Sequence, residues 1–241
     1  MQSSRKEPPG AAGGLARTRR QVIAALAVPV LATGTVISPL AARKRRKKKP
    51  KAKTRRVTRT YVNGGQIRIP GNAGELGRAD PYPSSLVVAD LKGGTVRHVS
   101  VTVKGLTHGT GDEVLLMLAK DTTNAVLMVR TGGKAPVNNA TITFDDLAAT
   151  TLPLATALVS GQFQPTLNDA LTSLPFHFPT PAPELNGNSL LSAFQGADPN
   201  GSWRLYAADR AIGGDGAISG GWELTITADV PKARKKRRKQ R

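Results

Sequence analysis

Apolar and polar residues alternate with a period of two along the centre of the chain. Residues 99–103 read Val-Ser-Val-Thr-Val, and residues 222–226 read Trp-Glu-Leu-Thr-Ile. Successive side chains of a strand point to opposite faces, so this alternation predicts half-buried β-strands. From residue 57 onward we find no long helical periodicity. The central part of the chain is therefore predicted to be all-β.

Turn sequences separate further apolar segments. Glycine or asparagine pairs occur at residues 64–65, 93–94, 132–133 and 138–139, and a Gly-Gly-Asp-Gly run occupies residues 213–216. They predict tight turns. Additional strands are expected at residues 66–69, 85–89, 114–119, 125–130, 140–144 and 203–208. About eight or nine short strands with this spacing predict a jelly-roll β-sandwich.

Residues 150–188 interrupt the pattern with six prolines and only one short candidate strand, at residues 157–163. Leucine and phenylalanine are too frequent there for a disordered linker. We expect a long ordered loop that covers one end or one face of the sandwich.

Charge is distributed unevenly along the chain. Residues 1–60 carry 17 basic and 1 acidic residue, residues 61–230 carry 10 and 15, and residues 231–241 carry 8 and none. The net charge of +19 therefore belongs to the ends. A folded basic groove for nucleic acid is not expected. The absence of cysteine excludes disulfides, thiolate catalysis and cysteine-based metal sites.

Residues 1–42 have the features of an export signal. A basic start ends in Arg19-Arg20, residues 21–42 are uncharged, and small residues stand at Ala41 and Ala42. The arginine pair resembles the twin-arginine type of bacterial signal. We expect an exported protein, extracellular or on the cell surface. The uncharged stretch is also long enough to span a bilayer, so a membrane anchor through residues 21–42 is the alternative.

Residues 43–60 and 231–241 concentrate positive charge with almost no apolar residues. Ordering them would cost entropy without burial, so we predict a disordered basic linker and a disordered basic tail. Such tracts attract anionic polymers, including a cell-wall polymer or a membrane surface, in a salt-dependent way. The alternative is a solvated linker and a solubilising tail.

A tryptophan and glycine pattern occupies the end of the predicted sandwich. Residues 194–196 read Phe-Gln-Gly, residues 199–205 read Pro-Asn-Gly-Ser-Trp-Arg-Leu, and the final strand contains Trp222-Glu-Leu. With Gly201, Trp203 and Gly220, this pattern resembles the closing part of the P domain of subtilisin-like proprotein convertases, also called P/Homo B, in its bacterial form. The resemblance spans about residues 61–230 and implies a standalone P-domain-like sandwich.

Members of that family often hold calcium near acidic turns. The resemblance therefore implies a Ca²⁺ site, and no other cofactor, at Asp112, Glu113, Asp209 and Asp215. Calcium prefers six to eight oxygen ligands, which carboxylates and loop carbonyls supply. Many relatives carry further aspartates where Leu115 and Arg210 stand here, so two carboxylates are missing.

The chain is predicted not to be an enzyme. In the convertases a separate subtilisin-like domain carries out catalysis, and this chain has no room for it. His98, His108 and His177 are the candidate bases, placed on the polar side of a strand, in a turn and in the apolar loop. None is flanked by a nucleophile signature or a metal-binding pair, so each is interpreted as structural.

Three functions follow from these features. The leading hypothesis is an exported, non-catalytic binding or adhesion module whose basic tails attract polyanions. The first alternative is an accessory or stabilising subunit of a separately encoded subtilisin-like serine protease. The second is a cytoplasmic binder of nucleic acid or another polyanion, which requires that residues 21–42 are not used as a signal.

Overall fold

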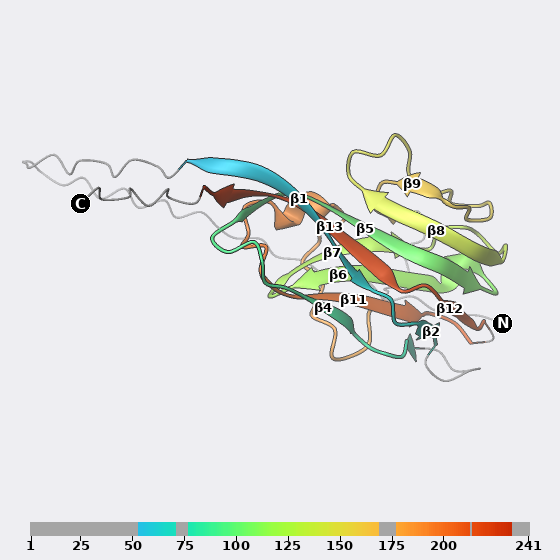
Figure 1. Ribbon diagram of the computed structural model, residues 1–241. Coiled ribbons are helices and arrows are strands. Elements are labelled where there is room, and N and C mark those ends of the chain that lie inside the picture. Colours follow the sequence, from blue (N-terminus) through green and yellow to red (C-terminus); the bar gives the residue numbers. More distant parts are fainter. Residues whose placement is uncertain (1–52, 71–76, 169–176, 213, 233–241) are drawn as a thin grey trace, which may run out of the picture. The chain divides into compact units, whose positions relative to one another are not determined.

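The computed structural model describes residues 53–70, 77–168, 177–212 and 214–232, all within the compact unit Lys49–Arg241. Two β-sheets form this part of the chain (Figure 1). The predicted export signal 1–42, residues 43–52 of the predicted linker and residues 233–241 of the predicted tail lie outside the described residues. Within the described part, no helix is both long and apolar enough to cross a membrane.

The first sheet has seven strands built around the long strand β5. One side of β5 contacts β13 and β12, which in turn pair with β1 and β2, and the other side contacts β8, which pairs in parallel with β9. The strands are β1 (Thr54–Asn63), β2 (Ile67–Ile69), β5 (Thr95–His108), β8 (Val137–Asp145), β9 (Gly161–Phe163), β12 (Gly216–Ile218) and β13 (Trp222–Pro231).

The second sheet has six strands around β6 and β11. Its order is β10-β7-β6-β11-β3, and β4 also pairs with β11. Among the described residues, two short 3-10 helices lie between strands, η1 (Gly111–Glu113) and η3 (Leu191–Phe194). The strands are β3 (Gly77–Arg78), β4 (Ser84–Val88), β6 (Val114–Lys120), β7 (Thr123–Val129), β10 (Thr166–Leu167) and β11 (Gly201–Asp209).

One hydrophobic core joins the facing surfaces of the two sheets. Val101 and Leu224 of the first sheet belong to the same buried cluster as Leu118 and Leu205 of the second. In β5 and β13 the buried residues alternate with exposed or half-buried polar residues, which follows from the two-residue period of a strand. The predicted all-β sandwich is thus confirmed.

The second sheet is buried on its outer face as well. Met117, Val126 and Tyr206 form a separate cluster there, and Phe178 packs on it from the segment after β10. Every residue of β6 is consequently buried. The expectation that the proline-rich segment covers one face of the sandwich is confirmed for its described residues. The segment also contributes β9, near the predicted short strand, and β10, which the sequence did not predict.

The sandwich begins earlier than the predicted residue 61, with a strand, β1, that the sequence did not predict. The sequence places residues 43–60 in a disordered linker, whereas Thr54 to Thr60 pair with β13 in an uninterrupted antiparallel register. Pairing supplies backbone hydrogen bonds, and Val57 and Tyr61 pack against the core. The arginines of β1 remain exposed, so their charge does not oppose strand formation. The linker prediction is therefore wrong from Thr54 onward, and the sandwich extends from residue 54 to residue 231.

Candidate functional site

Buried polar residues gather at the end of the sandwich where β5 passes into β6. The connection is η1, which places Asp112 and Glu113 in a tight turn with exposed fractions of 8% and 9%. Two backbone hydrogen bonds fix this turn, from Gly111 N to Ala135 O at 2.9 Å and from Asp112 N to Gly133 O at 3.0 Å. The acidic pair is therefore held against the start of β8.

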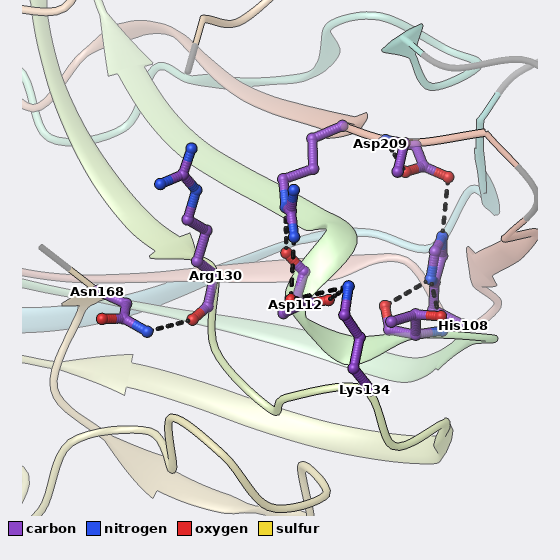
Figure 2. A network of polar contacts seen from close by, with 9 residues as sticks. His108, Asp112, Arg130, Lys134, Asn168 and Asp209 are labelled. Atoms are coloured by element: carbon purple, nitrogen blue, oxygen red, sulfur yellow. Dashed lines mark hydrogen bonds and ion pairs between the residues drawn. The ribbon is translucent and has the colours of Figure 1, made fainter. Parts of the chain in front are cut away.

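Asp112 is surrounded by cations (Figure 2). The guanidinium of Arg210 donates from Nε to the Asp112 carbonyl oxygen at 2.7 Å and from Nη2 to Oδ2 at 2.9 Å. Lys134 Nζ lies 3.4 Å from the same carboxylate. Arg210 N also donates to Glu113 O at 3.0 Å. These contacts tie the end of β11 to η1.

His108 and Asp209 form a second pair, with both side chains fully buried. His108 Nε2 lies 3.2 Å from Asp209 Oδ2, and Nδ1 lies 2.8 Å from the carbonyl oxygen of Thr110. Burial opposes the charged ring, but the hydrogen bond and charge of Asp209, the Thr110 carbonyl and the charge of Glu113 outweigh it. The pKa of His108 is consequently raised above 6.5. The pair links β5 of one sheet to β11 of the other.

The glycine-rich segment before β12 closes over this pair. A Cβ atom at Gly214 would lie 2.7 Å from Glu113 Oε2 and 2.8 Å from His108 Cε1. At Gly216 it would lie 2.1 Å from the Thr107 carbonyl oxygen. Only glycine therefore permits this close approach. Of the turn predicted at residues 213–216, the described residues Gly214 and Asp215 are irregular and Gly216 begins β12, so the tight turn is not seen in them.

Three of the four carboxylates that the resemblance implies as calcium ligands lie at this end. These are Asp112, Glu113 and Asp209, while the side chain of Asp215 is exposed and its backbone oxygen accepts from Gly109 N at 3.2 Å. Arg210 and Lys134 form ion pairs with the carboxylate of Asp112. Asp209 accepts from His108 and, through Oδ1, from Ala211 N at 2.9 Å.

This donor set does not fit calcium. A divalent cation needs several free oxygen ligands, whereas here cationic groups already face two of the carboxylates. Over the described residues, no group of three or more histidine, aspartate or glutamate side chains is arranged to hold a metal ion.

The signature residues have structural roles. Trp203 and Trp222 are fully buried, and their indole N–H groups donate to Pro199 O at 2.9 Å and to Ser84 Oγ at 3.0 Å. Gly201 has a φ of +112°, and Gly220 N donates to Lys104 O at 2.9 Å.

The three histidines lie in different parts of the fold. His98 lies 3.1 Å from Asp145 on the outer face of the first sheet, and His177 is exposed. His108 was predicted to lie in a turn, but it is the last residue of β5. That prediction was wrong because the strand continues through a bulged stretch that still pairs with β8 and β12.

A second candidate site lies at the opposite end of β5, where the described residues meet the basic tracts. Thr54 of β1 pairs with Pro231 of β13, and Lys232 N donates to Lys53 O at 2.9 Å. Lys53 of the amino-terminal tract (residues 43–59) and Lys232 of the carboxy-terminal tract (residues 232–241) therefore lie side by side. Sequence reasoning missed this junction. The β-branched residues Val57, Thr58 and Thr60 are the signal that could have extended the strand into the tract.

Comparison of the chain with family models, with curated proteins and with solved structures gave no match in any of the three. The resemblance to the P domain consequently stays a prediction from the motifs, and the two sites above are interpreted from their own geometry.

Proposed function

We propose that this protein is an exported, non-catalytic, P-domain-like binding module that adheres to anionic polymers through its two basic tracts. The observation that carries the proposal is the junction of Lys53 and Lys232, which brings the described ends of both tracts together.

The distribution of charge supports this assignment. Residues 53–232 contain 15 basic and 15 acidic residues, so the segment that includes the sandwich is neutral overall. Several of its cations are paired, as in Arg210 with Asp112 and Lys104 with Glu223. A neutral body creates no long-range attraction of its own, so the attraction to polyanions comes from the flanking charge.

The chemistry of the tracts favours electrostatic adhesion. Residues 43–59 carry 12 basic residues and residues 232–241 carry 8, with no acidic and no aromatic residue in either. Such segments bind phosphate or carboxylate polymers by releasing condensed counterions. Neither tract has an aromatic side chain on which nucleic-acid bases could stack. Wall polymers and anionic surfaces outside the cell are the partners that suit an exported chain.

The test is binding of the full chain to long-chain inorganic polyphosphate between 50 and 500 mM NaCl, chosen as about a tenfold range. We expect the logarithm of the affinity to fall linearly with the logarithm of the salt concentration. The control variant replaces Arg68 and Arg78 by glutamine. Both arginines are exposed at the end of the sandwich away from Lys53 and Lys232, so this variant removes positive charge outside the tracts. Absence of binding at 50 mM NaCl, or an affinity that does not change with the salt concentration, would refute the proposal.

Export is tested separately in the native host. Intact mass spectrometry of the protein outside the membrane should give a mass that corresponds to a start near Ala42 or Arg43. Full-length protein confined to the cytosol would contradict export and would make nucleic acid the first polyanion to examine.

A further inference from the structure

We propose that the free edge of β1 binds an extended acidic segment of a partner protein, which adds to the first sheet as a further strand. This inference goes beyond the proposed function, because the ligand is a polypeptide and the site is the strand itself. In the described part of the chain, β1 stands at one end of the first sheet and pairs with β13 alone (Figure 1).

The register of β1 determines which of its backbone groups face the free edge. Lys232 N donates to Lys53 O at 2.9 Å, and these two residues continue the register in which Thr54 stands opposite Pro231. Hydrogen-bonded and non-hydrogen-bonded pairs alternate along antiparallel strands. The odd-numbered residues from Lys53 onward therefore bond to β13. The N–H and C=O groups that point to the free edge belong to the even-numbered residues Thr54, Arg56, Thr58 and Thr60.

Two neighbouring contacts agree with this assignment. Pro231, which has no N–H, stands opposite Thr54, where β1 requires no donor from β13. The hydroxyl groups of Thr58 and Thr227 lie 2.9 Å apart, as expected because side chains approach most closely in non-hydrogen-bonded pairs. Among the described residues, no backbone group of another segment bonds to the outward groups, although Thr58 O accepts from Arg59 Nη1 at 3.2 Å.

Strand β1 is the longest strand at an end of either sheet in the part of the chain that the structure describes. It has ten residues, whereas the other end strands, β2, β3, β4, β9 and β10, have two to five. It contains no proline, and its register with β13 has no bulge. Proteins blunt their sheet edges with short strands, prolines, bulges or charge, and β1 has only charge. An added strand would gain main-chain hydrogen bonds along about seven residues.

The charge at this edge favours an acidic partner. Asp229 lies 3.1 Å from Arg56 Nε, but it is shared with Arg97 Nε at 2.7 Å. Asp90 lies 3.6 Å from Arg59 Nε. These two carboxylates do not balance the exposed cations of β1 and the residue before it, which are Lys53, Arg55, Arg56 and Arg59. Opposite charges on neighbouring strands stabilise their pairing, so glutamate or aspartate on an added strand would strengthen it.

The same charges disfavour a second copy of β1 as the partner. An antiparallel copy centred at Val57 would place Arg55 of each strand opposite Arg59 of the other. Like charges directly opposite each other destabilise a sheet. The arginines therefore keep the edge from pairing with itself and leave it available to an acidic strand.

The first experiment measures amide hydrogen exchange of the full chain by NMR in about 0.1 M NaCl. The probe is a capped eight-residue peptide of alternating glutamate and threonine, and the control peptide has lysine in place of glutamate. With the probe at about ten times its Kd, exchange of the Arg56, Thr58 and Thr60 amides should slow about tenfold. The Val57 amide, which already bonds to β13, should change little. The lysine peptide should leave all of these rates unchanged.

The second experiment compares Thr58→Pro with Thr58→Ala. Both variants lose the hydroxyl contact with Thr227, but only proline removes the outward N–H and places its ring at the free edge. Pairing with β13 does not use that N–H, so proline is compatible with the edge strand. Thr58→Pro should weaken binding of the glutamate peptide at least about tenfold, and Thr58→Ala should stay within about twofold of the unaltered protein. Urea unfolding checks that both variants fold.

A charge-reversal variant tests the choice of partner independently of proline. Arg55→Glu combined with Arg59→Glu should bind the lysine peptide in preference to the glutamate peptide. An unchanged preference would contradict recognition by these two arginines and overturn the assignment of an acidic partner.

The remaining outcomes are also decisive. Binding of the glutamate peptide without slower exchange of the outward amides would place the peptide elsewhere on the chain and overturn the proposal, as would absence of binding. Slower exchange of the same amides as the protein concentration rises, without peptide, would identify a second copy as the occupant and overturn the peptide assignment. Polyphosphate binding, measured separately on Thr58→Pro, should equal that of Thr58→Ala, so failure of this inference leaves the proposed function standing.

Discussion

At the scale of single residues, His108 and Asp209 show how a buried ionisable pair can join two sheets. Their side chains are fully buried, and they lie 101 positions apart in the sequence. Because the pKa of His108 is raised, the charged ring is stabilised in the folded state relative to the unfolded chain. The protonated ring therefore stabilises the folded state more than the neutral ring does.

The sign of the pH dependence follows directly. The stabilisation is complete below the unfolded pKa of about 6.5 and is lost as pH rises through the raised folded pKa. We expect the free energy of unfolding to decline from pH 6 into the alkaline range. Asp209→Asn should remove this decline and destabilise the protein by about 3–5 kcal/mol at pH 6, since it breaks a buried pair. Urea unfolding across the pH range measures both effects.

His98→Gln is the control for this experiment. It removes a histidine that contacts Asp145 on the partly exposed face and leaves the buried pair intact. The decline of the free energy of unfolding with rising pH that is due to His108 should persist in this variant. An identical pH profile for the unaltered protein and for Asp209→Asn would show that the buried pair does not link the sheets energetically.

Arg210 pairs with one of the carboxylates that were predicted to bind Ca²⁺. Its guanidinium and Lys134 neutralise Asp112, so Ca²⁺ would have to displace both cations. We expect the melting temperature of the protein to be the same in EDTA and in excess Ca²⁺. In Arg210→Asp combined with Lys134→Gln, the carboxylates lose their cations, and Ca²⁺ should raise the melting temperature by linkage to binding. A Ca²⁺-dependent rise in the unaltered protein would contradict this account.

At the scale of elements, alternation and the apolar segments between turns predicted most of the long strands from local sequence alone. β5 and β13 follow from alternation, and β6 and β11 follow from apolar segments. Strand β1 was not predicted, since Arg55, Arg56 and Arg59 give its first half the composition of a linker. Its strand state depends on β13, a partner about 170 residues away. The resemblance named Asp112, Glu113 and Asp209 of the buried site, but no local sequence pattern shows that His108 and Arg210 pair with two of them.

Strand β1 provides an element-scale prediction. A chain that begins at Tyr61, the boundary predicted from sequence, lacks Thr54–Thr60 and exposes the edge of β13 from Thr225 to Pro231. Loss of the pairing and of the Val57 contact should destabilise the sandwich by about 2–3 kcal/mol. An open edge should also promote self-association.

Urea unfolding and light scattering test this prediction against a chain that begins at Lys53. The longer chain should be monomeric at concentrations where the shorter one associates. Equal stability and equal mass for the two chains would mean that β1 pairs with β13 without supporting it.

At the scale of the whole molecule, stability and adhesion should be separable. Residues 53–232 contain every described strand and equal numbers of basic and acidic residues, whereas the net charge of +19 lies outside them. A chain of residues 53–232 should therefore unfold within about 0.5 kcal/mol of the full chain at 0.15 M salt, where exposed charges are screened. Its binding to polyphosphate should be lost. If removing residues 1–52 and 233–241 lowered stability by several kcal/mol, these residues would be part of the fold, and their charge could not be assigned to adhesion alone.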